Sequence, residues 1–203
     1  MHISEGVLSA SVLVSGAALG AAGTAIGLKK IDYDRIPEVA ILSAAFFVAS
    51  LVHVPIGPAS VHLILNGLVG VFLGWVAFPA ILVGLLLQVL LFKYGGLTSL
   101  GVNTVIMALP AAVCFHVFRS GIRSKNPATS MASSFLCGFG AIFLASLLAA
   151  LSLAFTGEQF LAVAKLIVIA HLPVMVIEGL VTVFCVKFLK RVKPEMLEVV
   201  YAR

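Results

Sequence analysis

Long apolar stretches, separated by short polar segments, dominate the chain. A helix that spans a membrane needs about 20 apolar residues, because each residue adds about 1.5 Å along the helix axis. A transmembrane β-barrel would instead show short segments in which apolar and polar residues alternate. The pattern therefore predicts an all-α, polytopic membrane protein with about seven transmembrane helices, over 7–28, 39–51, 62–76, 78–92, 97–118, 131–155 and 161–189.

The apolar run over 62–92 is the least regular part of this pattern. At 31 residues it is too long for a single span, so we divide it between Trp75 and Pro79, since proline interrupts helices. The whole chain is then expected to form one transmembrane domain over 1–203. This domain begins with a short segment over 1–6 and ends in a basic tail over 187–203.

The composition strengthens the membrane assignment. Hydrophobic residues make up 62% of the chain and charged residues 10%, whereas soluble domains have about 45–50% and about 25%. A soluble protein of this size has too little interior to hide so much apolar surface from water. A soluble fold is therefore excluded.

The positions of the basic residues predict the orientation in the membrane. With the N-terminus outside and the C-terminus in the cytoplasm, eleven of the thirteen Lys and Arg residues fall on the cytoplasmic side, as the positive-inside rule requires. The eleven are Lys29, Lys30, Arg35, Arg119, Arg123, Lys125, Lys187, Lys190, Arg191, Lys193 and Arg203. The net charge of +5 is thus explained by topology, and nucleic acid is not an expected partner.

Sequence motifs for nucleotide chemistry are absent. The chain has neither a GxxxxGK[ST] phosphate-binding loop nor a GxGxxG motif after a strand. We therefore expect a non-catalytic membrane protein without an organic cofactor. If it moves a substrate uphill, the energy comes from an ion gradient or from a partner ATPase.

Three alanines, Ala17, Ala21 and Ala25, lie on one face of the first expected span. Small residues at this spacing allow two helices to approach closely in lipid. The face packs either against the rest of this chain or against another membrane subunit, and the spacing alone is compatible with both.

The first two residues can form a metal chelate. The terminal amine of Met1, the amide nitrogen of His2 and the His2 imidazole can close adjacent chelate rings around one ion. Loss of the amide proton would cancel one of the two metal charges. A fourth nitrogen from a distant histidine would complete a planar set, which favours Ni²⁺ or Cu²⁺ and is compatible with Co²⁺.

His62 is the candidate for this fourth nitrogen, because it is expected on the same, outer side, where a loop passes into a helix. A polar side chain at the edge of the membrane needs a partner and is a candidate site residue. His53, in the same loop, either supports the ligands or lies at the membrane interface. His171 and Glu178, which share one face of the last expected span, are expected to pair with polar groups on neighbouring helices or with the loop that carries the site. His116 is expected near the opposite end of the bundle.

The chain also carries four motifs in order: MHISEG over 1–6, GPASVHL over 57–63, LFKYGGLTSLGVN over 91–103, and HLP over 171–173 with EGL over 178–180. Together they resemble the CbiM/NikM family, the cobalt/nickel substrate-capture subunits of energy-coupling-factor transporters. The resemblance implies a seven-helix protein whose N-terminal segment enters the bundle. It implies that the Met1 amine, the His2 amide and imidazole, and the His62 imidazole bind the ion, with Asn103 and Ser60 lining the site or holding its loops.

The resemblance also implies partners and a location. Such subunits work with a transmembrane coupling subunit (the T component), a cytoplasmic ATPase pair and, in some relatives, a small auxiliary membrane subunit. Ala17, Ala21 and Ala25 are then candidates for the docking face, and the protein belongs in the cytoplasmic membrane of a prokaryote. Ni²⁺ or Co²⁺ is the transported substrate, and the sequence does not choose between the two ions.

Two other functions fit a histidine-bearing membrane protein. A haem-binding electron-transfer subunit would need two histidines at similar depth on facing helices, and a colourless purified protein would exclude it. A gradient-driven metal permease would transport without an ATPase, so uptake that requires the ATPase would exclude it.

Overall fold

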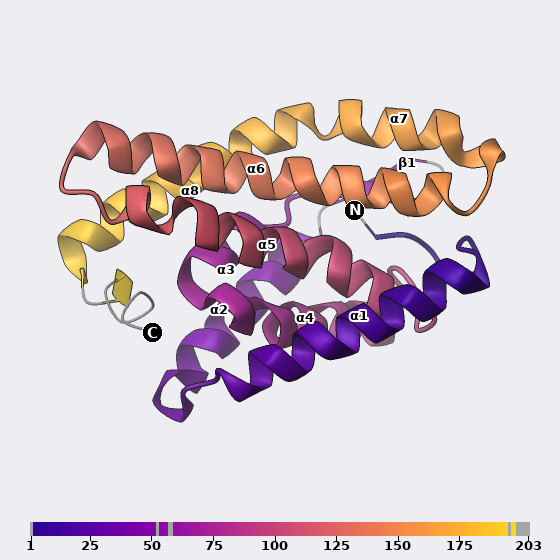
Figure 1. The fold of residues 1–203 in the computed structure, drawn as a ribbon, viewed down its shortest axis with the longest axis horizontal. Helices are drawn as coiled ribbons and strands as arrows, with labels where there is room; N and C mark the ends of the chain where they lie inside the picture. Colours follow the sequence, from indigo (N-terminus) through magenta and orange to yellow (C-terminus); the bar gives the residue numbers. More distant parts are fainter. Residues whose placement is uncertain (1, 52, 57–58, 195, 198–203) are drawn as a thin grey trace.

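The structure, a computed structural model, describes residues 2–51, 53–56, 59–194 and 196–197, of which 53–56, 59 and 60 are described by their backbone. This part of the chain forms eight α-helices, three short 3₁₀ helices and one antiparallel hairpin (Figure 1). The elements are α1 (Ala10–Lys29), η1 (Tyr33–Arg35), α2 (Ile36–Ala49), β1 (His53–Ile56), β2 (Ala59–His62), α3 (Asn66–Leu73), η2 (Gly74–Val76), α4 (Ala77–Phe92), α5 (Leu100–Ile122), α6 (Pro127–Ala154), η3 (Glu158–Phe160), α7 (Leu161–Ala170) and α8 (Leu172–Val192).

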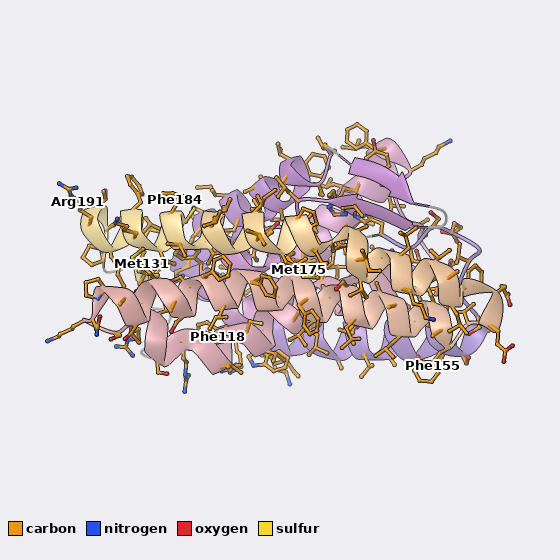
Figure 2. All side chains as sticks on the ribbon, turned by 90° about the horizontal axis from the view of Figure 1, so that it is seen from above. Phe118, Met131, Phe155, Met175, Phe184 and Arg191 are labelled. Carbon is orange, nitrogen blue, oxygen red and sulfur yellow. The ribbon has the colours of Figure 1, made fainter. Side chains whose placement is uncertain are left out.

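Five segments among the described residues are long and apolar enough to cross a membrane: α1, Asn66–Phe92, α5, α6 and Glu158–Val192. Their outer faces carry large apolar side chains. Phe155 and Phe184 are 78% and 70% exposed, and Figure 2 shows both pointing away from the bundle, whereas Met175 is fully buried. Such faces are favourable in lipid and unfavourable in water. The all-α membrane fold is thus confirmed, while the number of seven spans and the outside position of the N-terminus stay predictions.

The helix α5 lies at the centre of the bundle and packs against α1, α3, α4 and α6, while α6 also packs against α8. Small residues make these close approaches possible, as expected for helices in lipid. Gly70 of α3 lies against the Ala111 carbonyl, and Gly101 of α5 lies against the backbone of Ala17. Backbone-to-backbone contacts of this kind leave no space for a side chain.

Gly70 and Gly140 give a matched test of this packing. A Cβ atom at Gly70 would lie 2.4 Å from the Ala111 carbonyl oxygen, whereas at Gly140 its nearest neighbour would be the Cys114 sulfur at 3.5 Å. We expect Gly70→Ala to destabilise the fold by about 1–3 kcal/mol, as overpacking does, and to lower the melting temperature in detergent. Gly140→Ala should melt like the unchanged protein, and equal melting of the two variants would contradict this account.

Two long apolar runs are interrupted in the structure. The run over 62–92 breaks at Gly74, just before the predicted division, and Gly74 has φ 53°, a left-handed conformation that favours glycine. The span predicted over 161–189 lies within one membrane-crossing segment, Glu158–Val192, but a single continuous helix is wrong, because the chain forms α7 and α8 with His171 between them. Pro173 in the first turn of α8 accounts for the break, since proline has no N–H to continue the ladder of α7.

The segment predicted as a loop before His62 contains a hairpin. β1 and β2 pair antiparallel, with His53 opposite His62 and Pro55 opposite Ser60. The β-branched residues in these strands favour an extended backbone. The hairpin holds the backbone of His62 in a defined register.

The N-terminal segment turns back from the start of α1 toward the middle of the molecule (Figure 1). His2 is 5% exposed and Ile3 is fully buried. This inward course brings the second residue of the chain into the bundle.

Candidate metal centre

The loop between α4 and α5, together with the first turn of α5, binds the backbone of the N-terminal segment. The Asn103 side chain accepts the Ile3 N–H at 3.0 Å and donates to the Ile3 carbonyl at 3.1 Å, so it pairs with Ile3 as a neighbouring strand would. Ser99 Oγ donates to the same carbonyl at 2.9 Å, and the Glu5 N–H donates to the Gly95 carbonyl at 3.2 Å. These bonds fix the segment in one register along the chain.

The His2 imidazole is oriented by Gln88 of α4. The Gln88 amide nitrogen donates to Ser50 Oγ and to the Phe47 carbonyl, so its oxygen faces His2 and accepts from His2 Nε2 at 2.5 Å. A proton on Nε2 places the ring lone pair on Nδ1. Nδ1 is the nitrogen that can close a six-membered chelate ring with the amide nitrogen of the same residue.

The His62 imidazole stacks on His2. The two ring centroids lie 4.6 Å apart, with 23° between the ring planes. His62 Nδ1 donates to the Leu63 carbonyl at 2.8 Å, so the lone pair is on Nε2, which is buried and has no hydrogen-bond partner among the described atoms. Burial lowers the pKa of His62 well below its ordinary value. The imidazole is therefore neutral and available as a ligand at physiological pH.

Glu178 of α8 holds the turn that follows His62. Its Oε1 accepts the backbone N–H groups of Ile64 and Leu65 at 2.6 and 2.7 Å, and the side chain is fully buried. Leu65 has φ 56°, an unfavourable conformation for a side chain larger than glycine. The carboxylate stabilises this strained turn and so fixes the position of His62.

Removal of the Glu178 carboxylate should weaken metal binding through His62. In Glu178→Ala two buried N–H groups lose their acceptor, which costs about 1–3 kcal/mol each, and we expect both a lower melting temperature and an affinity for Ni²⁺ at least about tenfold weaker. Glu178→Gln keeps an oxygen acceptor and should recover most of the affinity. Calorimetric titration at a temperature where each variant is folded measures this, and a folded Glu178→Ala protein with full affinity would contradict the role.

The other predicted supporting residues are placed as follows. His171 is fully buried between α7 and α8, its Nδ1 donates to the Ile167 carbonyl at 2.7 Å, and its Nε2 has no partner among the described atoms. The backbones of His53 and Ser60 lie in the hairpin with His62, while their side chains, like the whole of Met1, lie outside the described residues. The roles of these residues stay predictions.

Ala17, Ala21 and Ala25 are exposed on α1, whereas the glycines of that helix are buried against the bundle. The alanine face is thus available to lipid or to another subunit, and its docking role stays a prediction. His116 is near the end of α5, a helix length from Ser99 and the N-terminal segment. It belongs to a separate pocket.

Side chains alone do not complete a metal site at His2 and His62. Within the described part of the chain, no three His, Cys, Asp or Glu side chains lie close enough together to hold a metal ion. Within the described residues, the imidazoles of His2 and His62 are thus a pair without a third side chain of these types beside them.

Sequence reasoning missed Gln88 as a site residue. The sequence does contain one signal, the single amide side chain of Gln88 in the apolar stretch of α4. A polar group buried in lipid must have a hydrogen-bond partner, so this amide indicates a contact with another polar residue. The sequence does not indicate which of the distant histidines that partner is.

The chain is similar to known metal transport proteins. Residues 2–196 match the family model described as "Cobalt uptake substrate-specific transmembrane region" (CbiM). A putative metal transport protein of Haemophilus influenzae is 42% identical, with 97% of each chain covered. A cobalt transport protein CbiM of Sorangium cellulosum is 30% identical, with 98% of this chain and 95% of the relative covered. A fused nickel transport protein NikMN of Rhodobacter capsulatus is 36% identical over 54% of this chain and 33% of its own length.

A solved structure has the same fold. A crystal structure of a transition metal transporter superposes with a TM-score of 0.79 at 26% identity, covering 95% of this chain and 93% of its own. The resemblance noted from the four sequence motifs is confirmed. The chain belongs to the CbiM family of cobalt-uptake, substrate-specific transmembrane proteins.

Proposed function

We propose that this chain is the substrate-capture subunit of an ATP-driven importer of the energy-coupling-factor type, and that it binds Ni²⁺ or Co²⁺ near the N-terminal segment. The ligands are the Met1 amine, the His2 amide nitrogen, His2 Nδ1 and His62 Nε2. The observation that carries the proposal is the arrangement of the two imidazoles, each held at one nitrogen by a protein acceptor so that the other nitrogen carries the lone pair.

The ligand set suits the proposed ions. Three nitrogen donors in two adjacent chelate rings, completed by a fourth nitrogen from His62, favour a planar arrangement, which is typical of Ni²⁺ and is compatible with Co²⁺. The names of the relatives include both a cobalt and a nickel transport protein. The choice between the two ions is best measured by competition on the purified chain.

The geometry disfavours a haem bound between His2 and His62. Paired axial histidines bind haem iron from opposite faces of the macrocycle, whereas the rings of His2 and His62 stack directly on one another at 4.6 Å. A macrocycle does not fit between them.

Energy coupling belongs to partners in this proposal. The chain has no phosphate-binding loop of its own, so a cytoplasmic ATPase pair and a transmembrane coupling subunit supply the driving force, and a small auxiliary membrane subunit completes some assemblies. The exposed face with Ala17, Ala21 and Ala25 is the proposed contact with the coupling subunit. The complex lies in the cytoplasmic membrane of a prokaryote, with the metal site at its outer end.

The test has two parts. Calorimetric titration of the purified chain with Ni²⁺ and with Co²⁺ should give one tight site, and cells that express the chain with its coupling subunit and ATPases should take up radioactive metal. Inactivation of the ATPase should stop uptake. Uptake that continues without the ATPase would favour a gradient-driven permease, and absence of metal binding by the purified chain would reject the site.

A further inference from the structure

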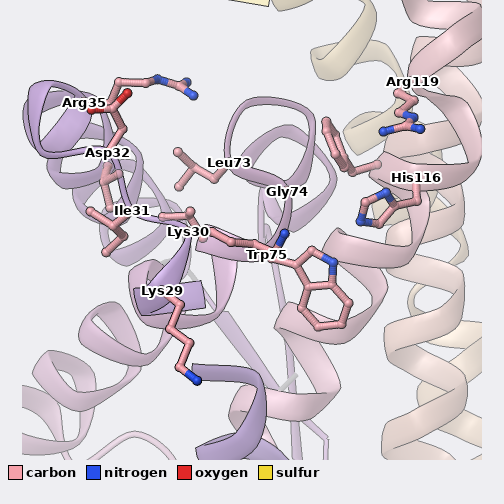
Figure 3. A pocket seen from close by; sticks show the side chains of 13 residues that line it. Lys29, Lys30, Ile31, Asp32, Arg35, Leu73, Gly74, Trp75, His116 and Arg119 are labelled. Carbon is pink, nitrogen blue, oxygen red and sulfur yellow. The ribbon is translucent and has the colours of Figure 1, made fainter. Parts of the chain in front are cut away.

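A basic pocket lies at the end of the bundle opposite the histidine site. It has a volume of about 330 Å³ and lies where the C-terminal ends of α1 and α5 meet η2 (Figure 3). Its walls carry Lys30 from the end of α1, Trp75 from η2, and His116 with Arg119 from α5. Three elements that are far apart in the sequence thus place positive and aromatic side chains around one cavity.

The pocket has an excess of positive charge. Among the described residues that line it, Arg35 is the basic group that forms an ion pair, with its Nε and Nη2 donating to Glu38 at 2.8 and 2.7 Å. The other charged residues of the lining are the cationic Lys29, Lys30 and Arg119 and the anionic Asp32. With the charge of Arg35 balanced by Glu38, the lining keeps more positive than negative charges, and this excess attracts an anion.

The remaining wall of the pocket is apolar. Trp75 stacks on Phe78 with ring centroids 5.7 Å apart, and Leu73 and Phe115 also line the pocket. In Figure 3, Lys30 extends toward Trp75, while His116 and Arg119 lie together on the α5 wall. Tryptophan next to basic residues at the end of spanning helices is typical of the membrane interface. A ligand that matches both walls has an anionic head and an apolar body.

A second basic pocket at the same end of the bundle is less suited to an anion. Its Lys190 ammonium already donates to the Ser124 carbonyl at 3.0 Å and to Ser130 Oγ at 2.6 Å. In the pocket at Trp75, by contrast, neither the Lys30 ammonium nor the Arg119 guanidinium contacts a carboxylate or a carbonyl within the described part of the chain.

We propose that the pocket at Trp75 binds the phosphate of an anionic phospholipid, with Lys30 and Arg119 on the phosphate and the glycerol region against Trp75 and Leu73. Basic pockets between transmembrane helices recognise anionic headgroups in this way. A zwitterionic headgroup fits less well, because its ammonium or choline group meets the same basic side chains. The site is independent of metal binding.

Thermal unfolding of the intact, detergent-purified chain tests the proposal with added phosphatidylglycerol, phosphatidylcholine or inorganic phosphate. Phosphatidylglycerol should raise the melting temperature most. The Lys30→Gln/Arg119→Gln variant should bind it roughly 30-fold more weakly, since each basic residue near a membrane surface contributes about a fivefold effect. Lys165→Gln/Lys193→Gln loses the same charge outside the pocket and should respond like the unchanged chain.

Three results would overturn the assignment. If phosphatidylglycerol stabilises the Lys30→Gln/Arg119→Gln variant as much as the unchanged chain, the lipid does not bind at this pocket. If inorganic phosphate stabilises the unchanged chain as much as phosphatidylglycerol does, the ligand is a soluble anion and not a lipid. Equal stabilisation of the unchanged chain by phosphatidylcholine and by phosphatidylglycerol would mean that the pocket does not select an anionic headgroup.

Discussion

A single residue added before Met1 is expected to abolish tight binding of Ni²⁺ or Co²⁺. The peptide bond to the added residue converts the Met1 amine into an amide, which lacks the basic lone pair of the amine. One of the four proposed ligands is thereby lost. We expect the affinity to fall by about 100-fold or more, because the loss of a ligand exceeds the 10–100-fold effect of losing its supporting partner.

The structure explains why the chain cannot compensate for the extra residue by sliding. Asn103 pairs with both backbone groups of Ile3, and Gln88 binds the His2 ring. A shift of one position would place a different side chain opposite Gln88 and would move the backbone pairing from Ile3 to its neighbour. The register that these contacts impose therefore makes the position of the amine critical.

Calorimetric titration of the purified chain measures this effect, with the intact mass confirming that the unextended protein begins at Met1. The matched control carries the same extra residue at the C-terminus and should bind like the unchanged chain. If the N-terminally extended protein keeps its full affinity, the amine is not a ligand and the proposed chelate is wrong.

The predictable part of this site is the part that rests on local chemistry. Met1 and His2 form a potential chelate in any conformation, and His62 is a polar residue at the end of an apolar stretch. The motif at 91–103 gave Asn103 as a candidate to line the site or to hold its loop, and the structure pairs Asn103 with the backbone of Ile3.

The contacts that the sequence could not predict are those between polar residues far apart in the chain. Gln88 meets His2 across 86 positions, and Glu178 meets Ile64 and Leu65 across more than 100. Spans that are apolar on every side have little periodicity to show which face turns inward, so the partner of each buried polar group stays undetermined. The break at His171 is different, because its physical cause, Pro173, is visible in the sequence.

His62→Ala and His2→Ala are each expected to lose most of the metal affinity, by about 100-fold or more. His62 contributes the donor that comes from outside the N-terminal segment, because its Nδ1 is bound to the Leu63 carbonyl and its Nε2 carries the lone pair. His2→Ala keeps the amide donor and removes the imidazole donor, and it leaves the Gln88 oxygen without its contact to the ring. The two variants should therefore fail for different structural reasons.

A spectroscopic measurement separates these reasons from a general loss of fold. His62→Ala keeps the amine, amide and His2 imidazole, so high concentrations of Ni²⁺ or Cu²⁺ should still give a chelate spectrum, shifted by replacement of one nitrogen with water. His2→Ala removes the ring that completes the chelate and should lose this spectrum. His116→Ala, in the pocket at the opposite end of the bundle, should change neither the affinity nor the spectrum. An unshifted spectrum in His62→Ala would mean that the fourth donor does not come from His62. The next residue to replace would then be His171, because its buried Nε2 has no partner among the described atoms.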